Sequence, residues 1–103
     1  MSKKILSIVK KLKAYKPEKV VLFGSYASGK NHQDSDLDLL VIKNTKQNYY
    51  ERIPEVRKYL MDTDFAFDIL VMTPKEISRS LSANDFFIMN IINNGQILYE
   101  AKK

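Results

Sequence analysis

Residues 20–43 read VVLFGSYASGKNHQDSDLDLLVIK, and the fold is decided by this stretch. It runs from a short apolar segment into Gly24 and Ser25, crosses a polar loop, and enters a second apolar segment through Asp36 and Asp38. Both apolar segments are predicted to be strands, the first of them buried. In an extended chain, side chains two residues apart leave the same face, so the two carboxylates point the same way, about 6–7 Å apart along the strand.

Carboxylates placed in this way can share divalent metal ions, an arrangement used for in-line displacement at phosphorus. A third carboxylate, Asp68, lies inside the apolar segment FAFDILVM, where a half-buried strand should not carry an unpaired charge. A neighbouring strand can bring it beside Asp36 and Asp38. Three clustered carboxylates raise one another's pKa unless cations compensate, so the pattern predicts bound Mg²⁺ or Mn²⁺. The alternative for the pair alone is a turn at Asp36 and a solvated strand edge at Asp38.

Gly24 and Ser25 directly follow a strand and precede a predicted helical turn at residues 25–27. Unsatisfied backbone N–H groups at such a turn favour anions, and the serine hydroxyl adds a donor. The pattern is not a P-loop, because no Lys-Ser/Thr pair follows the glycines. Lys30 is either a phosphate contact or a solvated loop lysine. The one histidine, His32, either touches phosphate or metal or is a solvated loop histidine.

The remaining pattern predicts one α/β (α+β) domain over residues 1–103, a small mixed β-sheet with helices packed on it. Helical spacing at residues 5–12 predicts a first helix, with Ser2 as its cap and Pro17 beyond its end. Thr73, Pro74 and Glu76 predict a capping box at the start of a later helix. The other expected elements are strands at residues 20–23, 37–43, 65–72 and 96–99, and helices at residues 49–60 and 84–93.

Composition narrows the class of protein. The 103 residues are 45% hydrophobic and 28% charged, as in a soluble globular domain. The absence of cysteine excludes disulfides and thiolate metal sites. No continuous apolar segment predicts a membrane span, so a cytoplasmic location is expected, with no membrane partner. The net charge of +5 is only a weak indicator of a polyanionic partner. No helix concentrates arginine and aromatic residues, so no direct nucleic-acid binding is expected.

Together, Gly24-Ser25, Gly29, the run SDLDL at residues 35–39 and the later Asp68 resemble the signature of the DNA polymerase β-like nucleotidyltransferase superfamily. The short chain and the run LFGS at residues 22–25 are similar to its minimal nucleotidyltransferase (MNT) branch. That branch is typically encoded beside HEPN proteins and acts as the antitoxin of HEPN–MNT pairs. The resemblance therefore implies a polymerase β-like core and a HEPN toxin as partner.

The resemblance also implies roles at the phosphates of ATP. Gly24 and Ser25 would hold the β and γ phosphates, with Lys30 as a further contact. Relatives commonly have arginine at the positions of Tyr26 and Ser28, and this chain does not. Because the forked guanidinium suits phosphate, its loss weakens the expected binding of the triphosphate unless Lys30 or a partner side chain substitutes.

At the metal site, the resemblance implies that Asp36 and Asp38 ligate two Mg²⁺ ions. Asp68 would complete the site and accept the proton of the attacking hydroxyl. A nucleotidyl group would then be transferred, and pyrophosphate would leave.

The predicted function is transfer of AMP from ATP to a hydroxyl group, that of a tyrosine in a cognate HEPN RNase toxin. By this transfer the chain would act as an antitoxin. One alternative is an antitoxin that neutralises the toxin by binding alone, through the apolar arc at residues 86–92. That arc has two interpretations, closure of the core or a subunit interface. Another alternative is a small hydroxylated acceptor such as an aminoglycoside, for which the chain lacks additional domain area.

Overall fold

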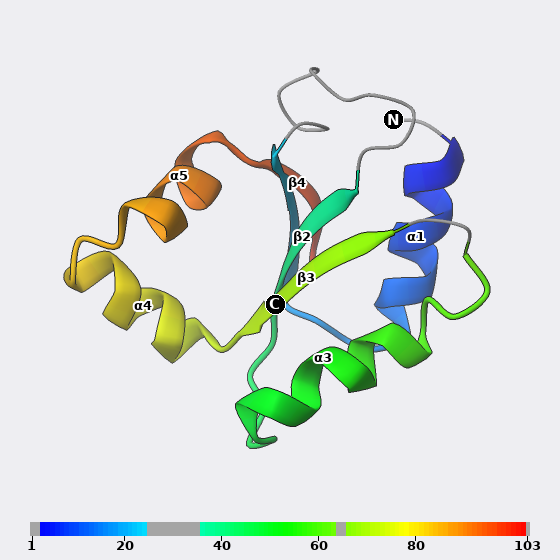
Figure 1. Cartoon of the computed structure of the whole chain (residues 1–103), viewed down its shortest axis with the longest axis horizontal. Helices are drawn as coiled ribbons and strands as arrows, with labels where there is room; N and C mark the ends of the chain where they lie inside the picture. Colours follow the sequence, from blue (N-terminus) through cyan, green and yellow to red (C-terminus); the bar gives the residue numbers. More distant parts are fainter. Residues whose placement is uncertain (1–2, 25–35, 64–65, 103) are drawn as a thin grey trace.

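The computed structural model describes residues 3–24, 36–63 and 66–102. In these ranges four helices pack on one four-stranded sheet, which confirms the predicted class and the order of the other elements (Figure 1). The helical turn predicted at residues 25–27 lies outside the described residues. No helix in the described ranges is long and apolar enough to cross a membrane. The strands are β1 (Lys19–Phe23), β2 (Leu37–Ile42), β3 (Phe67–Met72) and β4 (Gln96–Glu100). The helices are α1 (Lys3–Lys13), α3 (Tyr49–Lys58), α4 (Pro74–Ser82) and α5 (Phe86–Asn94).

The sheet is mixed, with the strand order β3-β2-β1-β4. β1 runs antiparallel to β2 and β4, whereas β2 and β3 run parallel. A parallel pair needs a crossover connection, which contains α3. β3 and β4 are the edge strands of the sheet in this order. With these directions, the end of β1 and the starts of β2 and β3 meet at one end of the sheet.

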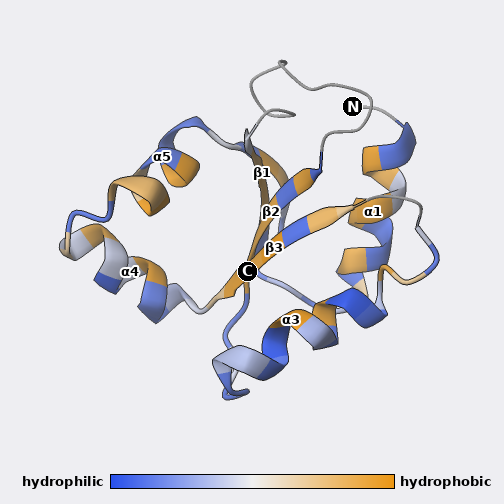
Figure 2. Ribbon diagram, in the orientation of Figure 1, coloured by the Kyte–Doolittle hydropathy of each residue, from blue (hydrophilic) through white to orange (hydrophobic). Residues whose placement is uncertain are grey.

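Each face of the sheet has its own apolar core. Leu37, Leu39 and Val41 of β2 pack with α1 and α3 on one face. Leu40 and Ile42 pack with α4 and α5 on the other face. Figure 2 shows the apolar positions of the helices gathered on the sides that look toward the sheet.

Local sequence signals explain several helix ends. Lys16, the residue before Pro17, has a left-handed φ of 62°, outside the right-handed helical region that a following proline disfavours. The capping box of α4 is confirmed, since Thr73 Oγ1 accepts from Glu76 N at 3.1 Å and Glu76 Oε1 accepts from Thr73 N at 2.8 Å. Pro74 begins this helix, as predicted. The predicted cap Ser2 lies outside the described residues.

The start of α5 was wrong in the sequence analysis, because the helix begins at Phe86 and not at residue 84. Asn84 has a left-handed φ of 57° in the turn after α4. Asp85 Oδ1 accepts hydrogen bonds from the N–H groups of Phe87 and Ile88, so Asp85 is the N-cap. Six other boundaries differ by one or two residues: β1 begins at Lys19, β2 ends at Ile42, α3 ends at Lys58, β3 begins at Phe67, α5 ends at Asn94 and β4 ends at Glu100.

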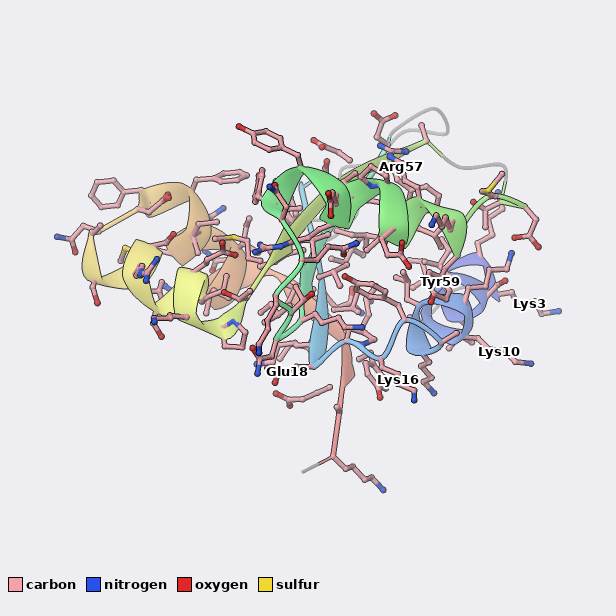
Figure 3. The ribbon with its side chains drawn as sticks, turned by 90° about the horizontal axis from the view of Figure 1, so that it is seen from below. Lys3, Lys10, Lys16, Glu18, Arg57 and Tyr59 are labelled. Atoms are coloured by element: carbon pink, nitrogen blue, oxygen red, sulfur yellow. The ribbon has the colours of Figure 1, made fainter. Side chains whose placement is uncertain are left out.

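The lysines of α1 suit their positions in the helix. Lys10, Lys11 and Lys13 lie in its last turn, where positive charge complements the helix dipole. Figure 3 shows Lys3 and Lys10 extending outward from α1. Part of the net positive charge therefore lies on the outer surface of the α1 and α3 layer.

A buried arginine, which the sequence analysis did not identify, joins the two helical layers around β3. Arg52 of α3 is only 6% exposed. Its Nε donates to Gln47 O at 3.0 Å, and its Nη1 donates to Val71 O at 3.3 Å and to Glu76 Oε1 at 2.6 Å. Burial raises the pKa of Glu76, but the hydrogen bonds from Arg52 and Thr73 outweigh it and hold that pKa below its ordinary value.

A second arginine of α3 acts on the same strand. Arg57, labelled in Figure 3, donates from Nη2 to Phe67 O at 3.1 Å. Arg52 and Arg57 thus satisfy two outward carbonyls of β3, which reduces the tendency of this edge strand to pair with another chain.

Replacing Arg52 with alanine should lower the free energy of unfolding by about 3 kcal/mol, because Glu76 and the Val71 carbonyl lose their donor. Lys58→Ala removes an exposed pair with Glu55 and is the matched control, with an expected loss of about 0.5 kcal/mol or less. Urea unfolding followed by circular dichroism measures both variants. Equal losses in the two variants would contradict the role given to Arg52.

Candidate active site

Two of the three predicted carboxylates meet at the end of the sheet where β1 ends and β2 and β3 begin (Figure 1). Asp38 and Asp68 are direct partners in the parallel pairing of β2 with β3. Neighbouring strands lie about 4.8 Å apart, so the two residues are next to each other. The sequence analysis expected a neighbouring strand to bring Asp68 to the pair, and the strand register confirms this for Asp38.

Both side chains leave the face of the sheet that α4 and α5 cover. Leu40 and Leu70, two residues further along β2 and β3, belong to the apolar core on that face. Because side chains alternate along a strand, Asp38 and Asp68 share this face. They therefore lie just beyond the edge of an apolar core, where solvent and ligands have access.

Burial and the repulsion of like charges both disfavour the ionised form of Asp38 in the carboxylate cluster. Asp38 is half-buried, whereas Asp36 and Asp68 are exposed. Burial raises the pKa of Asp38, and the negative charges of Asp68 and Asp36 raise this pKa further. None of the four ion pairs between described residues involves these carboxylates. In the described part of the chain, the cluster is thus a concentration of uncompensated negative charge.

Gly24 lies directly against the Asp38 carboxylate. A Cβ built on Gly24 would overlap Asp38 Oδ2 and lie 3.0 Å from Asp38 Cγ. Gly24 also has a φ of +73°, in the left-handed region that side chains other than glycine disfavour. Both observations require glycine here, and they place the Gly24 backbone in contact with the carboxylate cluster.

The hard oxygen donors of the cluster suit Mg²⁺ or Mn²⁺ by their chemistry, and the repulsion on Asp38 would be relieved by a cation. Among the described residues, however, no three His, Cys, Asp or Glu side chains are grouped so as to hold one ion. The geometry offers adjacent carboxylates rather than a closed cage. Additional ligands would have to come from substrate phosphates and water, as is usual for Mg²⁺.

The predicted phosphate contacts Ser25 and Lys30 lie outside the described residues. The same holds for Tyr26 and Ser28, which replace the arginines of relatives, and for His32. Of the predicted phosphate site, the structure describes Gly24 alone.

An aromatic pair beside the carboxylates was missed by the sequence analysis. Phe23 is the direct partner of Asp38 in the antiparallel pairing of β1 with β2. Its ring contacts Phe87 of α5 edge to face, with the ring centroids 5.9 Å apart and an interplanar angle of 85°. The sequence placed Phe87 in the apolar arc of the last helix. The contact with Phe23 depends on how α5 packs on β1, which no local signal reveals.

A cavity of about 750 Å³ lies away from the carboxylates, at the end of the sheet where β1 begins and β2 ends. Its lining includes Ile42, Ile77, Lys19 and Glu100. The charged pair is mutually satisfied, with Lys19 Nζ and Glu100 Oε2 3.0 Å apart. A carboxylate with a perturbed pKa is the better indicator of chemistry, so the candidate active site is placed at the Asp38 end.

Comparison with known proteins gives results consistent with this geometry. The chain matches the family described as polymerase beta, nucleotidyltransferase, over residues 3–103. It is 28% identical over 82 residues to "Putative protein adenylyltransferase MJ0604" of Methanocaldococcus jannaschii, an alignment that covers 80% of this chain and 78% of that protein.

Two solved structures share the fold. One chain of a toxin–antitoxin complex with AMP-PNP superposes with a TM-score of 0.69 and 23% identity, over 95% of this chain and 74% of that chain. One chain of a mutant MntA–HpeT toxin–antitoxin complex superposes with a TM-score of 0.66 and 21% identity, with the same coverage.

In the protein without divalent cations, carbon-13 NMR titration of the Asp38 carboxyl should give a pKa above the value of about 3.9 for free aspartate. Asp68→Asn removes a neighbouring like charge and should lower this pKa. Asp62→Asn removes an exposed carboxylate that pairs with Lys11 instead, and it should leave the titration of Asp38 unchanged. An Asp38 pKa that does not respond to Asp68→Asn would show that the two carboxylates are further apart than the register indicates.

Gly24→Ala should displace the Asp38 carboxylate and reduce stability by about 1–2 kcal/mol, because the new Cβ overlaps Oδ2 and the left-handed φ is strained. Gly95→Ala is the matched control. Its Cβ would lie 2.5 Å from Ile91 O, so it should also destabilise the fold, but at the junction of α5 and β4. The NMR signal of the Asp38 carboxyl should move in Gly24→Ala and stay in place in Gly95→Ala. An unmoved signal in Gly24→Ala would refute the contact.

Proposed function

This chain belongs to the polymerase beta nucleotidyltransferase family, and from that premise we propose that it transfers AMP from ATP to a hydroxyl of a partner toxin, a tyrosine of a HEPN RNase. The observation that carries the proposal is the in-register pairing of Asp38 with Asp68, with Asp36 two residues earlier and the Gly24 backbone in contact. This is the donor set that phosphoryl-transfer chemistry with divalent cations requires.

In this mechanism Asp36 and Asp38 would hold two Mg²⁺ ions, and Asp68 would complete the site. When bound, such cations would supply positive charge against the attacking and leaving oxygens. Asp68 accepts the proton of the acceptor hydroxyl. The hydroxyl oxygen forms a bond to the α-phosphorus of ATP, the bond from that phosphorus to the bridging oxygen breaks, and pyrophosphate leaves.

The phosphates are held by the segment that follows β1. The Gly24 backbone, the Ser25 hydroxyl and the Lys30 ammonium would bind the β and γ phosphates of ATP. Glycine permits this approach because it presents no Cβ between the backbone and a ligand. The contact between the Gly24 backbone and the Asp38 carboxylate supports this proposal, because a single triphosphate can reach both residues.

The known proteins support the choice of nucleotide and partner. The archaeal relative is named as a protein adenylyltransferase, and one structural neighbour is a toxin–antitoxin complex with AMP-PNP, an ATP analogue. The mutant MntA–HpeT complex carries glutamate in place of two aspartates two positions apart, the spacing of Asp36 and Asp38.

An antitoxin that acts by binding alone is the second candidate. It is favoured by the exposed apolar side chains of α5, since Phe86 is 78% exposed and Ile92 is 37% exposed. Exposed apolar surface of this kind is common at protein interfaces. The two candidates differ in what happens when the carboxylates are removed.

The wild-type chain, incubated with ATP, Mg²⁺ and its HEPN partner, should increase the mass of the partner by AMP units. Asp36→Ala/Asp38→Ala should abolish the increase, because the site then loses its metal ligands. Asp62→Ala, which removes an exposed carboxylate elsewhere, is the matched control and should retain activity. Intact-mass spectrometry of the partner is the measurement. A stable complex that protects cells without any mass gain would favour neutralisation by binding.

A further inference from the structure

An aromatic side chain near the carboxylates is only partly packed against the rest of the protein. Phe87 is 56% exposed on the first turn of α5, whereas Ile88 and Ile91 are the buried residues of this helix. Its ring contacts Phe23 edge to face. In such a pair at least one face of the Phe87 ring is not covered by Phe23, so a flat ligand can stack on it.

The position of Phe87 relative to the carboxylates follows from the sheet. Asp68, Asp38 and Phe23 form one row across β3, β2 and β1. Directly opposite residues in an antiparallel pair have Cβ atoms about 4.5–5.5 Å apart. The Phe87 ring centroid is a further 5.9 Å from that of Phe23. The Phe87 ring thus lies next to Phe23, the end residue of this row. It is on the face of the sheet from which Asp38 and Asp68 project.

We infer that Phe87, braced by Phe23, is the stacking platform for the base of the nucleotide. The inference rests on the proposed function, in which the α-phosphate lies at the carboxylates and the β and γ phosphates lie at Gly24 and beyond. The sugar and base are attached to the α-phosphate and not to the β or γ phosphates, so they lie at the carboxylate end of the triphosphate. An aromatic ring with an open face, one side chain from Asp38, is suited to receive a base there.

An aromatic stacking platform indicates which class of ligand would bind. Stacking recognises the π-face that every base presents, and it does not depend on a particular pattern of hydrogen bonds. Phe87 therefore adds affinity for a nucleoside triphosphate over an inorganic triphosphate. Phe86 does not share this role. It is 78% exposed on the same turn, and no ring contact joins it to Phe23 or to any other residue in the described ranges.

The test compares ATP with inorganic tripolyphosphate, which carries no base. Isothermal titration calorimetry in Mg²⁺ gives both affinities for the full-length wild-type chain, Phe87→Ala, Phe87→Leu and Phe86→Ala. Phe87→Leu keeps an apolar side chain on Phe23, so it guards against loss of the fold. Phe87→Ala and Phe87→Leu should weaken ATP binding roughly tenfold and leave tripolyphosphate binding unchanged. Phe86→Ala, the matched control, should change neither affinity.

Several outcomes would overturn the inference. Equal losses for ATP and tripolyphosphate in Phe87→Leu would mean that Phe87 only supports the fold of the site. Unchanged ATP binding in both Phe87 variants would mean that the base lies elsewhere, and a reduced rate of transfer to the partner would then assign Phe87 to the acceptor. A wild-type chain that binds neither ligand would refute the proposed function itself, an outcome distinct from the failure of the base platform.

Discussion

The register of three strands is the constraint on which the rest of the structure depends. β2 pairs with β1 and β3 so that Phe23, Asp38 and Asp68 form one row. A slip of one residue in the pairing of β2 with β3 would send the two carboxylates to opposite faces. The apolar side chains prevent such a slip, because Leu39 must reach the core under α1 and α3 while Leu40 reaches the core under α4 and α5. The pattern that fills two cores therefore also aligns the carboxylates.

The strand that carries Asp68 is an edge strand, and its position depends on the helix that precedes it. Two arginines of α3 hydrogen-bond to the outward carbonyls of β3, and Arg52 also reaches Glu76 at the start of α4. A buried guanidinium is costly to desolvate, and here three acceptors compensate for that cost. The lowered pKa of Glu76 keeps its carboxylate ionised at neutral pH, so the connection is present there and is lost as the pH falls through that pKa. Side chains remote from Asp38 and Asp68 thus hold one side of the candidate active site.

Two features of the candidate site reduce the stability of the folded protein. Burial and two like charges raise the pKa of Asp38, so its ionised form is disfavoured in the folded protein. Gly24 adds a left-handed backbone conformation in contact with that carboxylate. A bound cation would relieve the first of these costs, and a triphosphate would make use of the second. Unfavourable local features therefore gather at the junction of β1 and β2. A ligand site at this junction, as we propose, is consistent with the family to which the chain belongs.

Much of this could be predicted from local patterns. The capping box at Thr73 and the end of the first helix before Pro17 each depend on residues close together in the chain, and both were confirmed. The start of α5 was wrong because the apolar pattern extends into a turn in which Asp85 supplies the cap. The sequence by itself determined the order of elements, the face that each side chain of β2 takes, and the family, because these depend on periodicity and motif spacing. Only the tertiary structure decided that Asp68 lies beside Asp38, that Arg52 crosses the edge of the sheet, and that Phe87 meets Phe23. Those contacts join residues far apart in the chain, and they are set by how whole faces of helices and strands are buried together.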